Sequence, residues 1–217
     1  MYNEIMKLYH GSDKIIEKPT YGAGRSDCDY GSGFYLCKDF DVASLWASQN
    51  KDGGYVNEYN VELSKLKISY LNHNTKEDIL QWITLLTFFR IDEETRLSAL
   101  EEIKLLQSRY MIDLSKFDLI VGYRADDSYF DYTRFFLTNQ LPLELLKEAM
   151  ELGKLGLQYA LISKKAFKHI KYISSTRVQH NNAYDEITKT ANAEFEDIMR
   201  KKKVDQTYLR DILRENN

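Results

Sequence analysis

The residues best suited to chemistry lie in the first fifty positions, each beside a predicted turn or strand end. His10 is followed by glycine and serine after an apolar stretch, which places an imidazole and an accessible backbone at a strand terminus. Tyr35 follows a Gly31-x-Gly33 turn, and Trp46 lies eleven positions further on, in a predicted helix. Two such aromatic faces, brought together, can hold a flat ring between them. Taken alone, Gly-x-Gly also fits an ordinary hairpin, and His10 also fits a structural role.

The order of these motifs resembles the nucleotide-binding core of ADP-ribosyltransferases. Four segments carry the resemblance: Tyr9-His10-Gly11-Ser12, a glycine-rich loop with Arg25, the run from Asp29 to Tyr35, and a helix with Leu45-Trp46-Ala47. The chain most resembles a bacterial branch of that superfamily, the DUF3990 family, over about residues 5–63 and 117–173. The resemblance implies an α+β fold with the split antiparallel β-sheet of these enzymes, a helical insertion and a C-terminal helix.

The resemblance also implies NAD as substrate and assigns residues to it. In the His-Tyr-Glu class, the motif histidine contacts the adenosine ribose, and the next residue holds the nicotinamide amide through its backbone. The first motif tyrosine stacks on the nicotinamide ring, and a second aromatic residue often follows. These roles fall to His10, Gly11, Tyr35 and Trp46, with Ser12 in the same motif as His10. Trp46 departs from the usual tyrosine but keeps an aromatic face.

Two further positions complete the expected site. Arg25 is our candidate for the NAD diphosphate, because a guanidinium suits paired phosphate oxygens. Gln158 stands where the class usually has a glutamate that binds the nicotinamide ribose and stabilises the charge developing as nicotinamide leaves. Glutamine offers an acceptor and two donors but no negative charge. The implied catalytic residues are therefore His10, Tyr35 and Gln158, although an edge-strand glutamine meeting water is the alternative for Gln158.

The surrounding sequence predicts strands and helices that would position these residues. Alternating or continuous apolar stretches predict one strand that ends near Tyr9 and another that follows Gly33. Further strands are predicted over residues 55–63, 67–71, 117–122 and 156–163. Asp39 is a predicted N-cap for a helix over residues 40–49. Ser163 is expected to cap a short helix over residues 164–170, and helices are also expected over residues 128–138 and 142–152.

Residues 72–112 predict a helical insertion. Thr75 and Asp92 look like caps of two helices, and Trp82 fits the apolar stripe of the first. The second helix is expected to bury one stripe of leucine and isoleucine side chains, made of Leu97, Leu100, Ile103 and Leu106. After the strand at 117–122, Asp126 is expected to orient Arg124 or to cap the next helix, and a plain polar turn remains the alternative.

We divide the chain into an ADP-ribosyltransferase-like domain, residues 1–173, and an amphipathic helical extension, residues 174–217. Apolar residues recur every four positions in the extension, at Ile187, Ala191, Phe195 and Met199. Such a stripe must pack on its own domain, on a second copy or on a partner. The basic run at residues 200–203 is most simply a solvated face.

Composition limits the remaining function classes. The 217 residues carry a net charge of −3, so nothing points to general nucleic-acid binding. Cys28 and Cys37 are the only cysteines, and the N-terminus has no secretion signal, so we expect reduced thiols in the cytoplasm. No apolar run is long enough for a membrane span. The four histidines lack metal-ligand spacing, so no metal is expected.

We therefore predict an NAD-dependent mono-ADP-ribosyltransferase that releases nicotinamide. By resemblance, such a bacterial enzyme is a toxin or effector, often neutralised by a small antitoxin protein. Its acceptor is unknown: protein, nucleic acid or small molecule. One alternative is a catalytically weak or inactive module that binds NAD or ADP-ribose and acts through a protein partner. Another is an interaction protein in which the motifs are coincidental.

Overall fold

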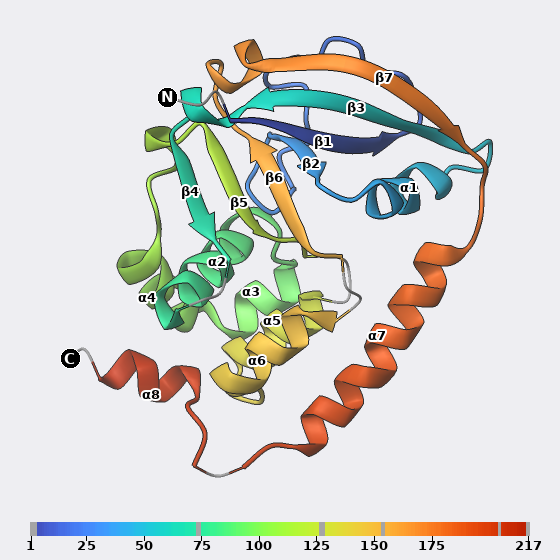
Figure 1. Cartoon of the computed structure of the whole chain (residues 1–217). Coiled ribbons are helices and arrows are strands. Elements are labelled where there is room, and N and C mark those ends of the chain that lie inside the picture. Colours follow the sequence, from blue (N-terminus) through green and yellow to red (C-terminus); the bar gives the residue numbers. More distant parts are fainter. Residues whose placement is uncertain (1–3, 73–74, 126–128, 153–154, 204, 216–217) are drawn as a thin grey trace.

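The computed structural model describes residues 4–72, 75–125, 129–152, 155–203 and 205–215. It is an α+β protein, as expected, and its centre is one seven-stranded sheet (Figure 1). Along the sheet the order is β4-β5-β6-β2-β1-β3-β7, and every neighbouring pair is antiparallel except β4 with β5. The strands are β1 (Ile5–Ser12), β2 (Phe34–Cys37), β3 (Gly54–Glu62), β4 (Ile68–Leu71), β5 (Leu119–Tyr123), β6 (Leu157–Leu161) and β7 (Ile170–Val178).

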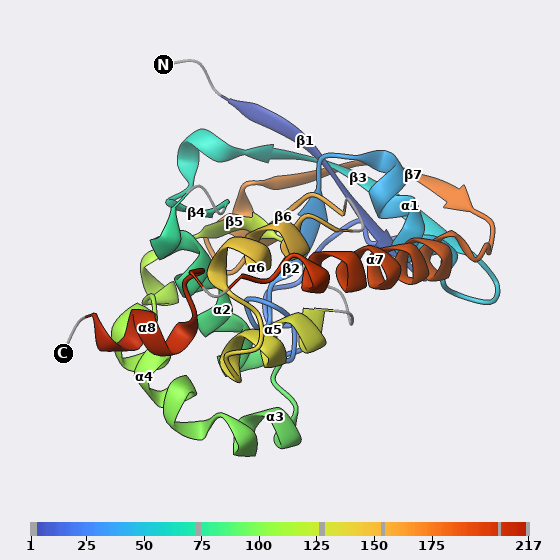
Figure 2. The ribbon, with the colours of Figure 1, turned by 90° about the horizontal axis from the view of Figure 1, so that it is seen from below.

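Helices cover one face and the ends of this sheet (Figures 1 and 2). The α-helices are α1 (Phe40–Ser48), α2 (Lys76–Phe89), α3 (Glu93–Ser98), α4 (Leu100–Tyr110), α5 (Tyr129–Leu137), α6 (Leu143–Met150), α7 (Ala183–Arg200) and α8 (Leu209–Arg214). Among the described residues, the 3-10 helix η1 (Leu63–Lys65) joins β3 to β4, η2 (Leu114–Lys116) joins α4 to β5, and η4 (Ala166–Lys168) joins β6 to β7.

Successive side chains of each strand point to opposite faces and contribute to two large cores and to a small cluster where α1 packs on the sheet. On one face, Leu36, Tyr59 and Val121 belong to a core formed largely by the strands themselves. On the other face, Ile120 and Ala160 pack against the helical core of α2, α4, α5, α6 and α8. Tyr35 packs against this second core, so it lies on the face opposite Leu36, as the strand pattern predicts.

The caps predicted at Asp39, Thr75 and Asp92 are confirmed. Asp39 accepts hydrogen bonds from two backbone N–H groups in the first turn of α1, and Thr75 and Asp92 each cap a helix through the side chain. Trp82 is fully buried, as expected for a core residue. The helix predicted over residues 164–170 with Ser163 as its cap is wrong: Ser163 Oγ accepts from the backbone N–H of Ala166 at 3.1 Å, but only the 3-10 turn η4 forms there, and its N-cap is Lys165.

The second insertion helix was predicted wrongly as one continuous element. Ala99 has φ −133°, outside the helical range, so the segment divides into α3 and α4. Because the axis changes direction there, Leu97 and Leu100 point away from the core and are 68% and 41% exposed. Only Ile103 and Leu106 of the predicted stripe are buried.

The C-terminal part begins with a strand that the sequence pattern did not predict. β7 pairs with β3 and extends past residue 173 to Val178, with mostly exposed polar side chains. The amphipathic rhythm that follows is confirmed as α7, which packs on this same chain: Phe195 stacks on Tyr132 with ring centroids 4.0 Å apart. α8 adds Leu209 and Ile212 to the helical core. Of the three packing partners considered for the stripe, the structure shows the chain's own domain.

Within the described ranges, no helix has the length and apolar character needed to cross a membrane.

Candidate functional site

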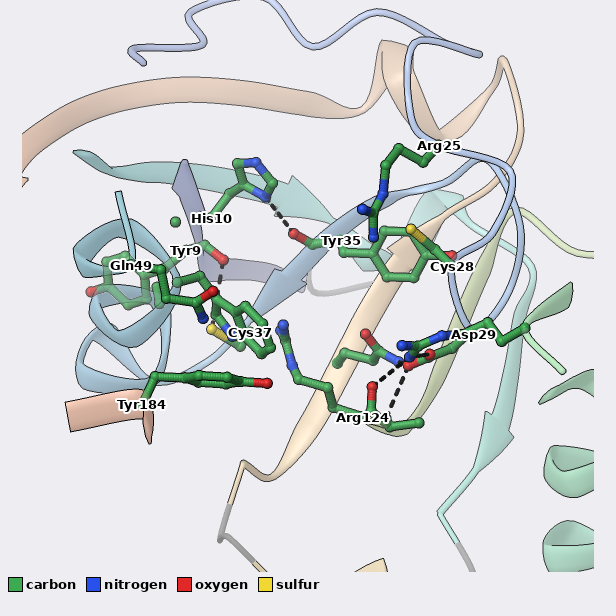
Figure 3. Close-up of a pocket in the computed structure, with 16 residues that line it drawn as sticks. Tyr9, His10, Arg25, Cys28, Asp29, Tyr35, Cys37, Gln49, Arg124 and Tyr184 are labelled. Atoms are coloured by element: carbon green, nitrogen blue, oxygen red, sulfur yellow. Dashed lines mark hydrogen bonds and ion pairs between the residues drawn. The ribbon is translucent and has the colours of Figure 1, made fainter. Parts of the chain in front are cut away.

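A cavity of about 540 Å³ opens on the helical face of the sheet, where α1 and the insertion leave the strands uncovered (Figure 3). Its floor is a row of paired positions: Tyr9 of β1 pairs with Cys37 of β2, Cys37 with Gln158 of β6, and Gln158 with Gly122 of β5. The paired side chains of a row share one face. The pairing therefore brings together residues that are far apart in the sequence.

His10, at the end of β1, lines this cavity as a neutral imidazole. Its Nδ1–H donates to the backbone carbonyl of Tyr35 at 2.7 Å. Burial, more than any other cause, lowers the pKa of His10 to about 4, and the nearby positive charge of Arg124 acts in the same direction. Because Nδ1 carries the proton, Nε2 is a hydrogen-bond acceptor near neutral pH.

Tyr35 offers its ring rather than its hydroxyl. The hydroxyl donates to the carbonyl of Gly31 at 2.6 Å and accepts from the backbone N–H of Tyr30 at 3.0 Å. Burial, helped by the charge of Asp29, raises the pKa of Tyr35 well above its usual value, so the phenol stays neutral. The bonds to the Gly-x-Gly turn, in which Gly31 has φ +75°, hold the ring in place beside the cavity.

Glycine is required at position 11 because α1 packs closely against β1 there. A Cβ added there would lie 2.0 Å from the carbonyl oxygen of Ala43 and 2.9 Å from the backbone nitrogen of Ala47, both in α1. The glycine therefore lets α1 approach β1 closely. Its backbone borders the same cavity as His10 and Tyr35.

Trp46 lines the cavity from α1, in contact with two residues that were not assigned to the site. The Arg124 guanidinium lies over its ring, 4.7 Å from the centroid. The ring of Tyr184, at the start of α7, is 4.9 Å from it at an interplanar angle of 55°. The indole N–H is buried and lacks a hydrogen-bond partner among the described residues. Trp46 thus shares the cavity with Tyr35, with part of its surface covered by Arg124 and Tyr184.

Gln158 is buried in the middle of the sheet, 2% exposed, so the alternative of an edge-strand glutamine meeting water is wrong. Its amide donates to the carboxylate of Asp29 and, at 3.3 Å, to the carbonyl of Tyr123. Asp29 also accepts from the backbone N–H of Ala125 at 3.0 Å and forms an ion pair with Arg90. A carboxylate therefore lies beside the neutral amide, with its charge compensated by Arg90.

A second cavity of about 600 Å³ adjoins the first along the loop that follows β1. Four residues line both cavities and mark their junction: His10, Arg25, Cys28 and Tyr35. Asn57 of β3 holds this loop, because its amide donates to Ser12 Oγ at 3.0 Å and to the carbonyl of Lys14 at 3.1 Å, and its Oδ1 accepts from the Ile16 N–H.

The remaining two predicted residues lie differently from the rest. Ser12 donates to the carbonyl of Lys14 and lines neither cavity. Arg25 lies at the rim, 78% exposed, and its Nε is 3.4 Å from Asp27. The structure thus brings His10, Gly11, Tyr35, Trp46 and Gln158 to one cavity, with Arg25 at its edge.

Among the cavity residues that were not assigned from the sequence are Asp29, Arg90, Arg124 and Tyr184. Asp29 lies inside the motif that carries the resemblance, so its carboxylate was a signal that we passed over. Arg124 was noted only as part of a polar turn, and Asp126, its expected partner, lies outside the described residues. Arg90 and Tyr184 come from the insertion and the tail, where no local pattern indicates a site.

The charges at the cavity favour an anionic ligand. Three arginines, Arg25, Arg90 and Arg124, and one aspartate, Asp29, line it, although the whole chain carries a net charge of −3. In the described ranges, no cluster of three or more histidine, cysteine, aspartate or glutamate residues could hold a metal ion.

The comparisons with known proteins identify one family. Residues 6–172 match the family model DUF3990, whose description is "Protein of unknown function". No curated protein and no solved structure was found to match the chain.

Proposed function

Since the chain belongs to the DUF3990 family, whose description names no activity, we propose from the site itself that it is an NAD-dependent mono-ADP-ribosyltransferase. The same proposal places its sheet in the split-sheet fold of the ADP-ribosyltransferase superfamily. The reaction is the transfer of ADP-ribose from NAD to an acceptor, with release of nicotinamide.

One observation carries the proposal: two cavities meet at residues that they share. A dinucleotide has two nucleosides joined by an anionic diphosphate, so it needs two compartments and a positive charge between them. The two cavities have comparable volumes, and Arg25 stands at their junction beside His10 and Tyr35. When NAD is bound, the guanidinium of Arg25 binds the diphosphate, since its side chain is exposed and its ion pair with Asp27 is an exposed one that can be exchanged.

The aromatic and imidazole groups then hold the two nucleosides. The ring of Tyr35 stacks on the nicotinamide. Because the Tyr35 hydroxyl is already hydrogen-bonded to the backbone of the turn, the face of the ring is the part that contacts the ligand. Trp46 borders the same compartment. His10, neutral and with Nε2 unprotonated, accepts a hydrogen bond from a ribose hydroxyl. Catalysis comes mostly from holding NAD in one compact pose, and the acceptor supplies the nucleophile.

Gln158 and Asp29 share the task that a glutamate performs in the resembling class. Gln158 is positioned by Asp29, and the carboxylate of Asp29 supplies negative potential one hydrogen bond further from the reacting carbon. Because Arg90 compensates that charge, the stabilisation is weaker than a glutamate would give. We expect slow transfer of a single ADP-ribose unit.

Labelled NAD tests the proposal. Full-length protein is incubated with NAD carrying label in the ADP-ribose part, and nicotinamide release and label transfer are followed. Tyr35→Ala should weaken NAD binding about tenfold or more through lost stacking. Tyr70→Ala, a change at an exposed tyrosine of edge strand β4, is the matched control. Equal effects of the two substitutions would contradict the assigned site.

The buried amide at position 158 also favours a second candidate, a module that binds NAD or ADP-ribose without turnover. Gln158 is a neutral donor held by Asp29, and Asp29 is held by Arg90, so the carboxylate of Asp29 is not free to face the reacting carbon. Saturable NAD binding by calorimetry, with no nicotinamide released over hours, would support this candidate over the transferase.

The biological setting extends the same proposal. A transferase of this kind acts as a bacterial toxin or effector on a cellular target, with a small antitoxin protein as its partner. We place the reaction in the cytoplasm, in keeping with the two free cysteines. Mass spectrometry of host extracts after induced expression would identify the modified target, and an unmodified proteome and nucleic-acid pool would argue against this setting.

A further inference from the structure

Arg124 is a cation in the site that the roles above leave unassigned. Its guanidinium lies over the ring of Trp46, 4.7 Å from the centroid, and its Nε is buried with no hydrogen-bond partner among the described residues. None of the described carboxylates forms an ion pair with it, whereas the two other arginines of the cavity each pair with an aspartate.

The groups that face Arg124 from the neighbouring elements carry little compensating charge. His10 is neutral, with its pKa lowered to about 4 chiefly by burial. Burial raises the pKa of the Cys37 thiol, so it stays protonated, and the Gln158 amide does not ionise. Asp29 is engaged by Arg90. A largely desolvated guanidinium that forms no ion pair with any described carboxylate is costly, so a ligand that brings an anionic group to it binds favourably.

The position of Arg124 separates this anion from the diphosphate of NAD. The diphosphate joins the two nucleosides, so it belongs at the junction that the two cavities share, where Arg25 lies. Arg124 borders only the first cavity, next to Trp46 and in the same cavity as Gln158. An anion at Arg124 therefore lies on the nicotinamide side, near the carbon that receives the nucleophile.

We propose that Arg124 binds the carboxylate of the acceptor, a glutamate or aspartate side chain of a target protein, and presents it to NAD; this rests on the proposed function. One carboxylate oxygen forms a bond to C1 of the nicotinamide ribose, and the C1–N bond breaks with its electron pair passing to the ring nitrogen of nicotinamide. The product is an ADP-ribosyl ester, and no proton is transferred.

An acceptor that arrives deprotonated suits this site. Gln158 cannot act as a general base, and Asp29 is tied to Arg90. A protein carboxylate is favoured over a nucleic-acid phosphate, because the chain carries a net charge of −3 and repels a polyanionic backbone.

Small probes test the proposal without knowledge of the natural target. Full-length protein is incubated with NAD and an excess of acetate, acetamide or methyl phosphate. The ratio of ester product to free ADP-ribose is measured by mass spectrometry. Neutral hydroxylamine cleaves a carboxylate ester, so it identifies the ester product. Arg124→Gln should lower the acetate ratio at least about tenfold, the factor that one charge-assisted hydrogen bond is worth. Arg124→Lys keeps the positive charge but loses the planar guanidinium, so its acetate ratio should lie between those of the wild type and Arg124→Gln.

The ratio is read within each reaction, so a change in overall rate does not affect it. Arg96→Gln, at an exposed arginine of α3, is the control and should behave as the wild type. Acetate ester that depends on Arg124, with none from acetamide, supports the proposal. Nicotinamide release without acetate ester, a ratio unchanged in Arg124→Gln, or ester from methyl phosphate alone would overturn it. Absence of any nicotinamide release would instead overturn the proposed function, and this inference with it.

Discussion

Gln158 and Asp29, 129 positions apart in the sequence, are joined by a hydrogen bond from the Gln158 amide to the Asp29 carboxylate in the middle of the sheet. The pairing of β6 with β2 and β5 brings Gln158 there, and the loop before β2 brings Asp29. Arg90, at the C-terminal end of α2 in the insertion, completes the group. Three segments of the chain thus meet at one buried charge pair, which makes the site sensitive to single substitutions.

Asp29→Asn should destabilise the protein strongly. Asp29 and Arg90 are only 4% and 13% exposed, so the substitution leaves a desolvated guanidinium without its counter-charge. We expect a loss of about 3 kcal/mol in the free energy of unfolding, measured by urea denaturation. Asp27→Asn, which removes an exposed ion pair with Arg25, should cost less than about 1 kcal/mol. Comparable losses of stability in the two variants would mean that the buried Asp29–Arg90 pair contributes no more than the exposed pair.

Gln158→Glu should make stability depend on pH in a defined direction. The new carboxyl would be buried beside the carboxylate of Asp29, and both effects raise its pKa above the ordinary value of about 4.3. A group whose pKa is raised by folding is tolerated below its unfolded pKa and destabilises as pH rises. The variant should therefore match the wild type near pH 4 and be less stable by roughly 2 kcal/mol at pH 7. A constant difference in urea midpoints across this range would refute the coupling.

His10 should make the protein less stable in mild acid. Its folded pKa is about 4, below the ordinary 6.5, so the unfolded chain binds more protons between these values and stability falls as pH drops through this window. Because the side chain is partly exposed, we expect a loss of roughly 2 kcal/mol, less than the full shift would give. His10→Gln should remove this slope. His180→Gln is the control, since Nδ1 of His180 also bonds a backbone carbonyl, that of Ser48, but His180 does not line the cavity.

Gly11→Ala should destabilise the fold even without NAD. The added Cβ would lie 2.0 Å from the carbonyl oxygen of Ala43, so α1 must move away from β1. We expect a cost of about 2–3 kcal/mol by thermal or urea unfolding. Gly156→Ala is the comparison: that glycine has φ +65° and open space around it, so only backbone strain of about 1 kcal/mol applies. A tolerated Gly11→Ala would mean that α1 packs less closely on β1 than the structure shows.

Tyr184→Ala should expose Trp46. The chain contains two tryptophans, and Trp82 is fully buried, so a red shift in emission reports on Trp46. Loss of the Tyr184 ring uncovers one side of the indole, and we expect a red shift together with weaker NAD binding. Tyr208→Ala, at a tyrosine that contacts Arg210 rather than the site, should leave the emission unchanged. An unshifted spectrum in Tyr184→Ala would show that α7 does not cover the cavity in solution.

The sequence by itself determined the local elements and one side of the site. The cap at Asp39, the turn before Tyr35 and the strand ending near His10 depend only on neighbouring residues, so the local sequence pattern predicts them.

Asp29, Arg90 and Arg124 were not assigned, because each acquires its partner only through strand pairing or helix packing between distant segments. β7 was missed since residues 174–177 of the strand are all polar and its pairing with β3 is non-local. Only the tertiary structure decided that Gln158 is buried beside a carboxylate, because burial is a property of the assembled sheet and not of the residues beside it in the chain.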